Sequence, residues 1–130
     1  LYPYEAANGA CRANGKKRVA KVPSFVSVPE NNETELANAL KELGPLSVGI
    51  NATLVQFYQK KKVIKANKVL CNPKKLDHAV LIVGNKNNVY KVKNSWGTSF
   101  GDDGFFLIEA GTNACGIAED VTFPNAVALS

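Results

Sequence analysis

Residues 76–104, LDHAVLIVGNKNNVYKVKNSWGTSFGDDG, decide the fold that this chain can adopt. The apolar run 79–83 is followed by a polar stretch of Gly, Asn and Lys, and then by the run 89–93, in which apolar and basic residues alternate. Two strand-like runs joined by a turn of this composition predict a β-hairpin. Because the turn lies at the far end, we expect the start of the first strand and the end of the second to share one edge.

That edge brings the chain's only histidine close to an asparagine. His78 precedes the first strand, and Asn94 follows the second, two residues before the chain's only tryptophan, Trp96. A carboxamide beside an imidazole can fix the tautomer and the ring orientation that general acid–base catalysis needs. A lone histidine can equally be a hydrogen-bonded structural residue. The asparagine, and an indole able to shield the pair, favour the catalytic interpretation, and the sequence alone leaves both open.

Three motifs carry a resemblance to a known enzyme family. DHAV at 77–80, NSWGTSFGDDGFF at 94–106 and NACGI at 113–117 resemble, in order and spacing, the C-terminal half of the papain-like cysteine peptidases, the cathepsin family. The similarity covers nearly the whole chain, from Tyr2 onwards. It implies an α+β papain-like fold, here mainly the antiparallel β-barrel (right-hand) lobe with one or two short helices, and a Cys-His-Asn catalytic arrangement.

The resemblance divides the chain into two parts. Residues 1–24 correspond to the segment that crosses between the two lobes, and residues 25–130 to the β-barrel lobe. Within the lobe, Asn32 predicts the cap of a helix with a leucine stripe at 36, 40 and 43, which Gly44 ends. Strands are predicted at 19–28, where Pro23 indicates an edge strand or an interruption, and at 46–51, 105–109 and 118–123.

The resemblance also assigns catalytic roles. It implies that His78 is the catalytic base and later the acid, that Asn94 orients it, and that Trp96 covers their hydrogen bond and borders the leaving-group side of the cleft. The nucleophile of the family lies in a Cys-Gly-Ser-Cys-Trp-like segment about 130–150 residues before the histidine. Only 77 residues precede His78 here, and they contain neither this segment nor the oxyanion-hole glutamine. We therefore expect the nucleophilic cysteine in a missing N-terminal half or in a partner chain.

A substrate pocket is predicted around a glycine in a strand. Glycine inside a strand often marks the close approach of a ligand or of another backbone. By resemblance, Gly49, Leu76 and Ala79 are walls of the pocket that receives the P2 side chain, two residues before the scissile bond, and Asp120 is its base. An acid there implies that Arg or Lys is accepted as well as Leu or Phe. The alternatives are a packing glycine and an aspartate that points to solvent.

The three cysteines are Cys11, Cys71 and Cys115. In a secreted or lysosomal setting, this odd number predicts one bridge and one thiol that stays free or bonds another chain. The resemblance pairs Cys71 with Cys115 and directs Cys11 to the missing half. The alternative is three reduced cysteines in a cytosolic protein. No metal site is expected, because Cys-x-x-Cys spacing is absent and the sole histidine has another assignment.

Composition excludes several classes of protein. The chain has 130 residues, 45% of them hydrophobic, and a formal charge of +5, which fits one globular domain. Lysines gather at 60–62 and 74–75, but no nucleic-acid-binding motif accompanies them, so we interpret them as solvated loops. No apolar run reaches about 18 residues, so no membrane span is expected.

The function expected from these observations is peptide-bond hydrolysis through an acyl-enzyme, without a cofactor. The expected partners are the half that bears the catalytic cysteine, polypeptide substrates, a propeptide and cystatin-like inhibitors, in a lysosomal, vacuolar or secreted location. Two alternatives stay open: a non-catalytic papain-like homologue that serves as a binding or structural protein, and a free-standing binding domain of one barrel. The intact set of His78, Asn94 and Trp96 favours the enzyme.

Overall fold

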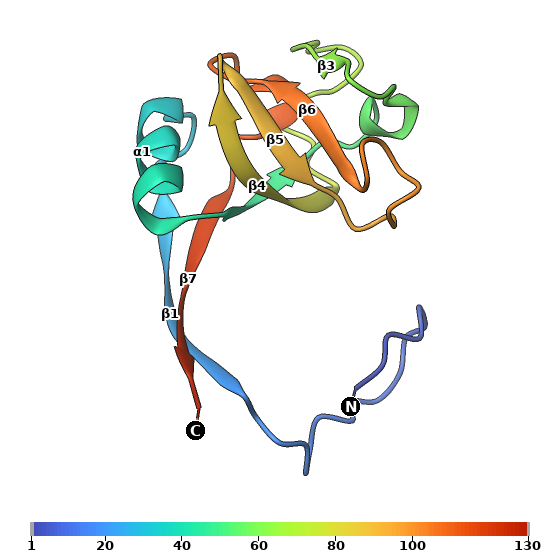
Figure 1. The fold of residues 1–130 in the computed structure, drawn as a ribbon, viewed down its shortest axis with the longest axis vertical. Helices are drawn as coiled ribbons and strands as arrows, with labels where there is room; N and C mark the ends of the chain where they lie inside the picture. Colours follow the sequence, from blue (N-terminus) through green and yellow to red (C-terminus); the bar gives the residue numbers. More distant parts are fainter. Residues whose placement is uncertain (1, 130) are drawn as a thin grey trace.

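The computed structural model describes residues 2–129. In that range the chain forms one α-helix, two short 3-10 helices and seven β-strands (Figure 1). The elements follow in the order β1 (Ala20–Val28), α1 (Glu33–Leu43), β2 (Leu46–Ile50), η1 (Val55–Phe57), β3 (Val63–Ile64), β4 (His78–Lys86), β5 (Val89–Lys93), β6 (Phe105–Glu109), η2 (Ala114–Gly116) and β7 (Val121–Ala128).

All seven strands belong to one sheet, in the order β1-β7-β2-β4-β5-β6-β3. Every neighbouring pair is antiparallel except β3 and β6, which are parallel. The α+β class expected from the sequence is confirmed. Within residues 2–129 the sheet is open, with β1 and β3 at its edges, rather than a closed barrel. The reason is visible in Figure 1, where β1 and β7 leave the body of the sheet together as a two-stranded ribbon.

The hairpin predicted between 79 and 93 is confirmed as β4 and β5. Ile82 pairs with Val92 and Lys86 with Val89, so the connection is the two residues Asn87 and Asn88. Both have positive φ, at 53° and 57°. Two-residue hairpin turns with positive φ match the right-handed twist of the strands, and asparagine tolerates this conformation better than most residues. The turn sets the register next to it, and a shift in register between Ile82 and Gly84 gives the alignment of the two strand ends.

The predicted helix is also confirmed. The side chain of Asn32 accepts a hydrogen bond from the backbone N–H of Glu35 at 3.0 Å, which caps the helix start. Gly44, with φ of 99°, ends it. Leu36 is fully buried, but Leu43, the third residue of the predicted stripe, is 41% exposed because it lies at the last turn. The core between helix and sheet is completed by Leu46, Ile50, Ile82, Tyr90, Val92, Phe106, Ile108 and Ile117.

The last strand was predicted wrongly: it begins at Val121, not at residue 118, and runs through Pro124 to Ala128. Beyond Thr122 it pairs with β1 alone, since β2 reaches only Val121 and Thr122. One side of β7 is then open, and a proline without an N–H is tolerated on such a side. On β1, the pairing with β7 shifts register between Lys21 and Ser24, the interruption that the sequence predicted around residue 23.

The β1–β7 ribbon and the segment before it are exposed to solvent. Phe25 on β1 is 67% exposed, and Val22 and Val127 are also exposed. Residues 2–18 form no helix or strand and are exposed throughout, as expected from the sequence. Their assignment to an inter-lobe crossing, with a boundary at residue 24, stays a prediction; β1 begins at Ala20, inside that assigned range.

Candidate active site

The hairpin places His78 and Asn94 in direct contact. His78 is the first residue of β4, and Asn94 follows the end of β5. Nε2 of His78 lies 2.8 Å from Oδ1 of Asn94, and that oxygen also accepts the backbone N–H of Ser95 at 2.8 Å. Because a backbone N–H must face an oxygen, the carboxamide orientation is fixed, and Nε2 of His78 is the donor. Nδ1 is therefore the ring atom that remains for a reacting group.

An aromatic stack covers one face of this pair. The ring of Trp96 stacks on His78, with centroids 5.0 Å apart and planes inclined by 27°. Phe100 meets the indole edge-on at 5.2 Å and in turn contacts Phe106 at 6.2 Å and Tyr58 at 6.0 Å. Contacts of this kind contribute beyond simple burial. The imidazole is thus linked by successive aromatic contacts to the hydrophobic core.

The loop after Asn94 closes on itself to hold the asparagine in place. The backbone N–H of Asn94 donates to the carbonyl of Gly104 at 2.9 Å, and the N–H of Gly104 donates to the carbonyl of Phe100 at 2.8 Å. Gly104 has φ of 92°, and a Cβ there would lie 3.3 Å from the carbonyl oxygen of Gly97. Glycine is needed for both reasons. Asn94 itself is only 8% exposed.

The four residues predicted to form the P2 pocket come together. Gly49 on β2 pairs with Ala79 on β4, and its N–H donates to the carbonyl of Asp120 at 3.0 Å. A Cβ on Gly49 would lie 2.9 Å from Cδ1 of Leu76 and 3.7 Å from Cβ of Asp120. The side chain of Asp120 is exposed and forms no ion pair with any residue from 2 to 129. Their role in binding a P2 side chain stays a prediction, and we refer to these four residues, Gly49, Leu76, Ala79 and Asp120, as the predicted P2 pocket.

Sequence reasoning missed Asp77, which anchors the strand that carries His78. Its N–H donates to the carbonyl of Ile50 at 3.0 Å, and its Oδ1 accepts the N–H of Ala52 at 2.9 Å. These bonds join the start of β4 to the end of β2. An aspartate immediately before the histidine was a visible signal, since Asp side chains commonly bind nearby backbone N–H groups.

Glu33 on α1 was also missed. Its carboxylate accepts the hydroxyl of Tyr90 at 2.9 Å and the backbone N–H groups of Gly111 and Asn113, each at 2.5 Å. Burial, and then the hydrogen bond to this carboxylate, raise the pKa of Tyr90 above its usual range. The partners are far apart in sequence, so no local pattern reveals them. These hydrogen bonds connect α1 to the loop that carries Cys115.

The predicted disulfide is confirmed. Cys71 and Cys115 are bridged, with a Cα–Cα distance of 4.8 Å and a sequence separation of 44. Cys11 lies in the exposed N-terminal segment and is a free thiol in the described structure. Its predicted bond to a missing half remains a prediction.

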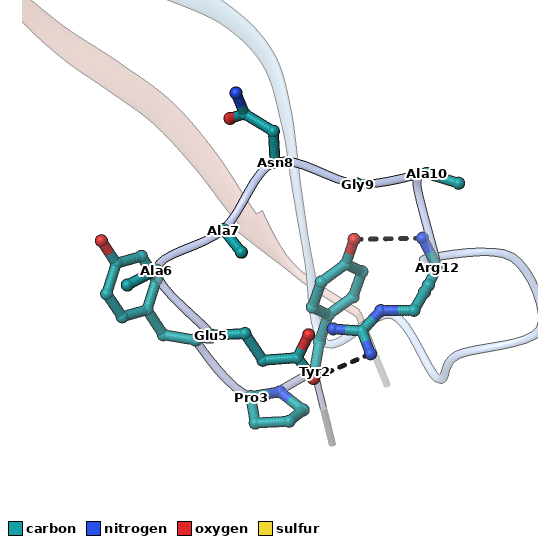
Figure 2. A pocket seen from close by; sticks show the side chains of 10 residues that line it. Tyr2, Pro3, Glu5, Ala6, Ala7, Asn8, Gly9, Ala10 and Arg12 are labelled. Atoms are coloured by element: carbon teal, nitrogen blue, oxygen red, sulfur yellow. Dashed lines mark hydrogen bonds and ion pairs between the residues drawn. The ribbon is translucent and has the colours of Figure 1, made fainter.

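A separate hollow of about 450 Å³ is formed by the N-terminal segment alone (Figure 2). It is closed by two contacts of Arg12, whose N–H donates to the hydroxyl of Tyr2 at 3.0 Å and whose guanidinium pairs with Glu5 at 2.9 Å. The lining residues, from Tyr2 to Arg12, are all exposed and include none of the candidate catalytic or pocket residues. This hollow is a bend of the N-terminal segment rather than the candidate site.

Comparison with known proteins shows the family of this chain. A family model described as papain family cysteine protease matches residues 1–125, and this chain belongs to that family. It is 40% identical to Cathepsin F of Drosophila melanogaster over 93% of this chain and 21% of that protein. It is 37% identical to Procathepsin L of Mus musculus, over 95% of this chain and 39% of that protein.

A solved structure extends the likeness to the fold. Digestive procathepsin L 3 from the larval midgut of Tenebrio molitor superposes with a TM-score of 0.83 at 32% identity, covering 95% of this chain and 41% of that one. The chain thus spans less than half the length of each of these relatives. Among residues 2–129 we find no helix with the length and hydrophobicity needed to cross a membrane.

Proposed function

We propose that this chain supplies the histidine and asparagine of a cysteine peptidase whose nucleophilic cysteine lies in a missing N-terminal half or in a partner chain. The observation that carries the proposal is the 2.8 Å contact between Nε2 of His78 and Oδ1 of Asn94, beneath the stacked ring of Trp96. An imidazole held in one tautomer, with its other nitrogen available, is suited to exchange a proton with a thiol.

In the proposed reaction a thiolate attacks the peptide carbonyl while His78 is the imidazolium. His78 then donates a proton from Nδ1 to the leaving amine, which breaks the C–N bond and leaves an acyl-enzyme. Neutral His78 next takes a proton from water, whose oxygen attacks the thioester and releases the acid and the thiolate. Asn94 keeps the ring oriented throughout, and Trp96 shields the His78–Asn94 hydrogen bond from water. Pairing with histidine lowers the thiol pKa to about 3–4 in papain-like enzymes, so the ion pair persists at acidic pH.

Three observations support a nucleophile supplied from outside this chain. Cys71 and Cys115 are bridged to each other, and Cys11 lies in the segment that Figure 1 shows apart from β4 and β5. Nδ2 of Asn94 is buried without a hydrogen-bond partner among the described residues, and an acceptor from another half would satisfy it. The exposed apolar side chains of the β1–β7 ribbon, including Phe25, would be covered by the same half.

The P2 pocket supports a dual substrate preference. Its walls, Gly49, Leu76 and Ala79, are apolar, which suits Leu or Phe at P2. Asp120 stands at the edge of the same pocket with an unpaired carboxylate, which suits Arg or Lys. We propose that both classes of peptide are cleaved.

The setting proposed for the enzyme is lysosomal, vacuolar or secreted, since the disulfide is typical of oxidising compartments. Two of the relatives are named procathepsins, which supports a propeptide; cystatin-like inhibitors are proposed as further partners. A non-catalytic homologue is the second candidate. The contact between His78 and Asn94 and the stacking of Trp96 favour the enzyme, because a binding protein does not need this arrangement.

The test begins with native protein, whose intact mass is measured with and without reductant. We expect a second polypeptide that carries a cysteine, or one longer chain that contains both halves. Peptide cleavage is then compared for His78→Ala and for Asn85→Ala, an exposed residue on the same hairpin. Loss of a general acid–base group should lower kcat about 10²–10⁴-fold, and the control should retain full activity. Unchanged cleavage by the His78 variant would overturn the proposal.

A further inference from the structure

An ion pair joins two loops beside the P2 pocket. Nζ of Lys74 lies 2.6 Å from Oε2 of Glu119 and 2.8 Å from Oε1 of Glu30. Oε1 of Glu119 also accepts Nδ2 of Asn113 at 2.6 Å. The side chain of Glu119 is only 7% exposed, while those of Lys74 and Glu30 are largely in solvent. Exposed pairs contribute little, but here one carboxylate is buried and its loss of a partner is costly.

The two residues of this pair stand next to pocket residues in the sequence. Lys74 stands two residues before Leu76, which is a pocket wall, and Glu119 immediately precedes Asp120, the pocket base. The loop that carries Lys74 packs tightly, because a Cβ on Gly116 would lie 2.5 Å from the carbonyl oxygen of Pro73 and 2.6 Å from Cδ2 of Leu76. The ion pair therefore clamps the wall of the pocket to its base.

The pair also decides which charge the pocket presents. Glu119 and Asp120 are neighbours in sequence, and a carboxylate at either position attracts a cationic side chain. Glu119 shares Lys74 with Glu30, so one ammonium faces two carboxylates there, while Asp120 has no ion-pair partner among residues 2–129. Burial alone would raise the pKa of Glu119, but hydrogen bonds, chiefly from Lys74, outweigh it and lower that pKa, so the carboxylate is charged and paired.

We propose that Lys74 and Glu119 are positioning residues that set the charge selectivity of the P2 pocket, by holding Leu76 in place and by offsetting the charge of Glu119 next to Asp120. This inference rests on the proposed peptidase function and deepens it. It predicts opposite effects from breaking the same pair at its two ends, since one change leaves an extra negative charge and the other an extra positive charge next to Asp120.

The experiment uses the assembled protein, with the half that bears the nucleophile, and two peptides that differ only in Arg or Leu at P2. Lys74→Gln frees Glu119, so the Arg/Leu ratio of kcat/KM should rise, on the order of threefold to tenfold for a unit charge near the protein surface. Glu119→Gln leaves Lys74 partly unpaired, so the ratio should fall by a similar factor. Lys74→Arg keeps the charge and should retain the parent ratio.

A matched control is Lys65→Gln, which removes the other lysine of the chain that pairs with a partly buried glutamate. Lys65 lies 3.0 Å from Glu109, in a pair that shares no residue with the P2 pocket, and its loss should leave the ratio unchanged. If Lys74→Gln and Glu119→Gln shift the ratio in the same direction, or lower cleavage of both peptides equally, the pair has only a structural role and the inference is overturned.

The same two peptides, made non-cleavable by reducing the scissile amide to CH2–NH so that no electrophile faces the thiol, report the pocket by binding in titration calorimetry, without turnover. If Lys74→Gln and Glu119→Gln shift the Arg/Leu binding ratio in opposite directions but the protein cleaves neither peptide, the role of the ion pair is supported and the peptidase proposal is overturned. If the protein cleaves the peptides but neither variant shifts the Arg/Leu ratio, the peptidase proposal is supported and the role of the ion pair is overturned. Neither cleavage nor binding of any peptide would overturn both.

Discussion

Nε2 of His78 donates to Oδ1 of Asn94 at 2.8 Å, across a distance of 16 residues in sequence. The hydrogen bond exists because the β4–β5 hairpin turns at Asn87 and Asn88 and returns the chain to its starting edge. The acceptor is held by the N–H of Ser95, so the ring cannot turn without losing a bond. A two-residue turn at one end of a hairpin thus sets the protonation chemistry at the other.

Replacing Asn94 by alanine should lower kcat/KM, because the imidazolium loses the partner that stabilises it. Hydrogen bonds to charged groups contribute about 1.5–3 kcal/mol, which corresponds to a loss of roughly 10- to 100-fold. Steady-state cleavage across a pH series measures this effect. A variant with parent activity would show that Asn94 does not orient the histidine.

Trp96→Ala should expose the His78–Asn94 hydrogen bond to water. The stacking contact at 5.0 Å is lost, and aromatic pairs of this kind contribute about 0.5–1.5 kcal/mol. We expect kcat to fall severalfold, with Trp96→Phe retaining most activity because it keeps an aromatic face. Equal losses in the alanine and phenylalanine variants would point to a role of the indole N–H instead of stacking.

Asp120→Ala should separate the two proposed substrate classes. Cleavage of the peptide with Arg at P2 should drop about tenfold or more, since a charge-assisted contact is removed, while cleavage of the peptide with Leu at P2 stays close to the parent value. The comparison is the Arg/Leu ratio of kcat/KM on peptides that are otherwise identical. An unchanged ratio would mean that the Asp120 carboxylate points to solvent in the assembled enzyme.

Cleaving the disulfide should destabilise the lobe. A bridge that closes 44 residues restricts the unfolded chain, and the chain-entropy estimate gives a stabilisation of roughly 4 kcal/mol. Cys71→Ser and Cys115→Ser should both lower the urea midpoint of the assembled protein, and the two variants should have similar midpoints. Because the bridge lies beside the loop of Lys74, the variants should also bind P2 peptides less tightly. A midpoint within error of the parent would show that the bridge adds no stability.

Stability should fall at both extremes of pH. The hydrogen bond from Lys65, and then the N–H of Ala66, hold the pKa of Glu109 below its ordinary 4.5. A carboxylate whose pKa is lower in the folded state stabilises the fold at pH values above its unfolded pKa. That stability is lost as the pH falls through the folded pKa. The hydrogen bonds to Glu119 and Glu30 raise the pKa of Lys74 above 10.5, so its contribution is present below that pH and lost as pH rises through the folded value.

Urea unfolding across this range measures both limbs. Glu109→Gln should flatten the acid limb below about pH 4.5, and Lys74→Gln should flatten the basic limb. If the acid limb of Glu109→Gln is identical to that of the parent protein, other carboxylates cause the loss of stability at low pH.

Much of the fold and the site could be predicted, because the decisive signals were local. Alternating apolar residues gave the β4–β5 hairpin, Asn32 gave the helix start, and the composition of the turn gave the approach of His78 to Asn94. The confirmed disulfide came from resemblance rather than from spacing, and so did the P2 pocket, which stays a prediction.

What the sequence did not reveal depends on long-range contacts. The continuation of β7 through Pro124 depends on which strands flank it, and proline alone indicates only a break. The bonds of Glu33 to Tyr90 and to residues 111 and 113, and the bridge between Lys74 and Glu119, join charged residues that look like ordinary surface positions. Tertiary partners, not local pattern, gave them their roles.

The central claim is that His78 and Asn94 act on a cysteine outside this chain. Iodoacetamide labelling of the native protein at mildly acidic pH, followed by peptide mapping, tests it most directly, because only a thiolate paired with histidine reacts fast under those conditions. The account predicts that activity is lost in proportion to one label, that the label lies on a cysteine outside residues 1–130, and that His78→Ala abolishes rapid labelling. Rapid labelling of Cys11 with loss of activity, or full activity after complete labelling, would contradict it.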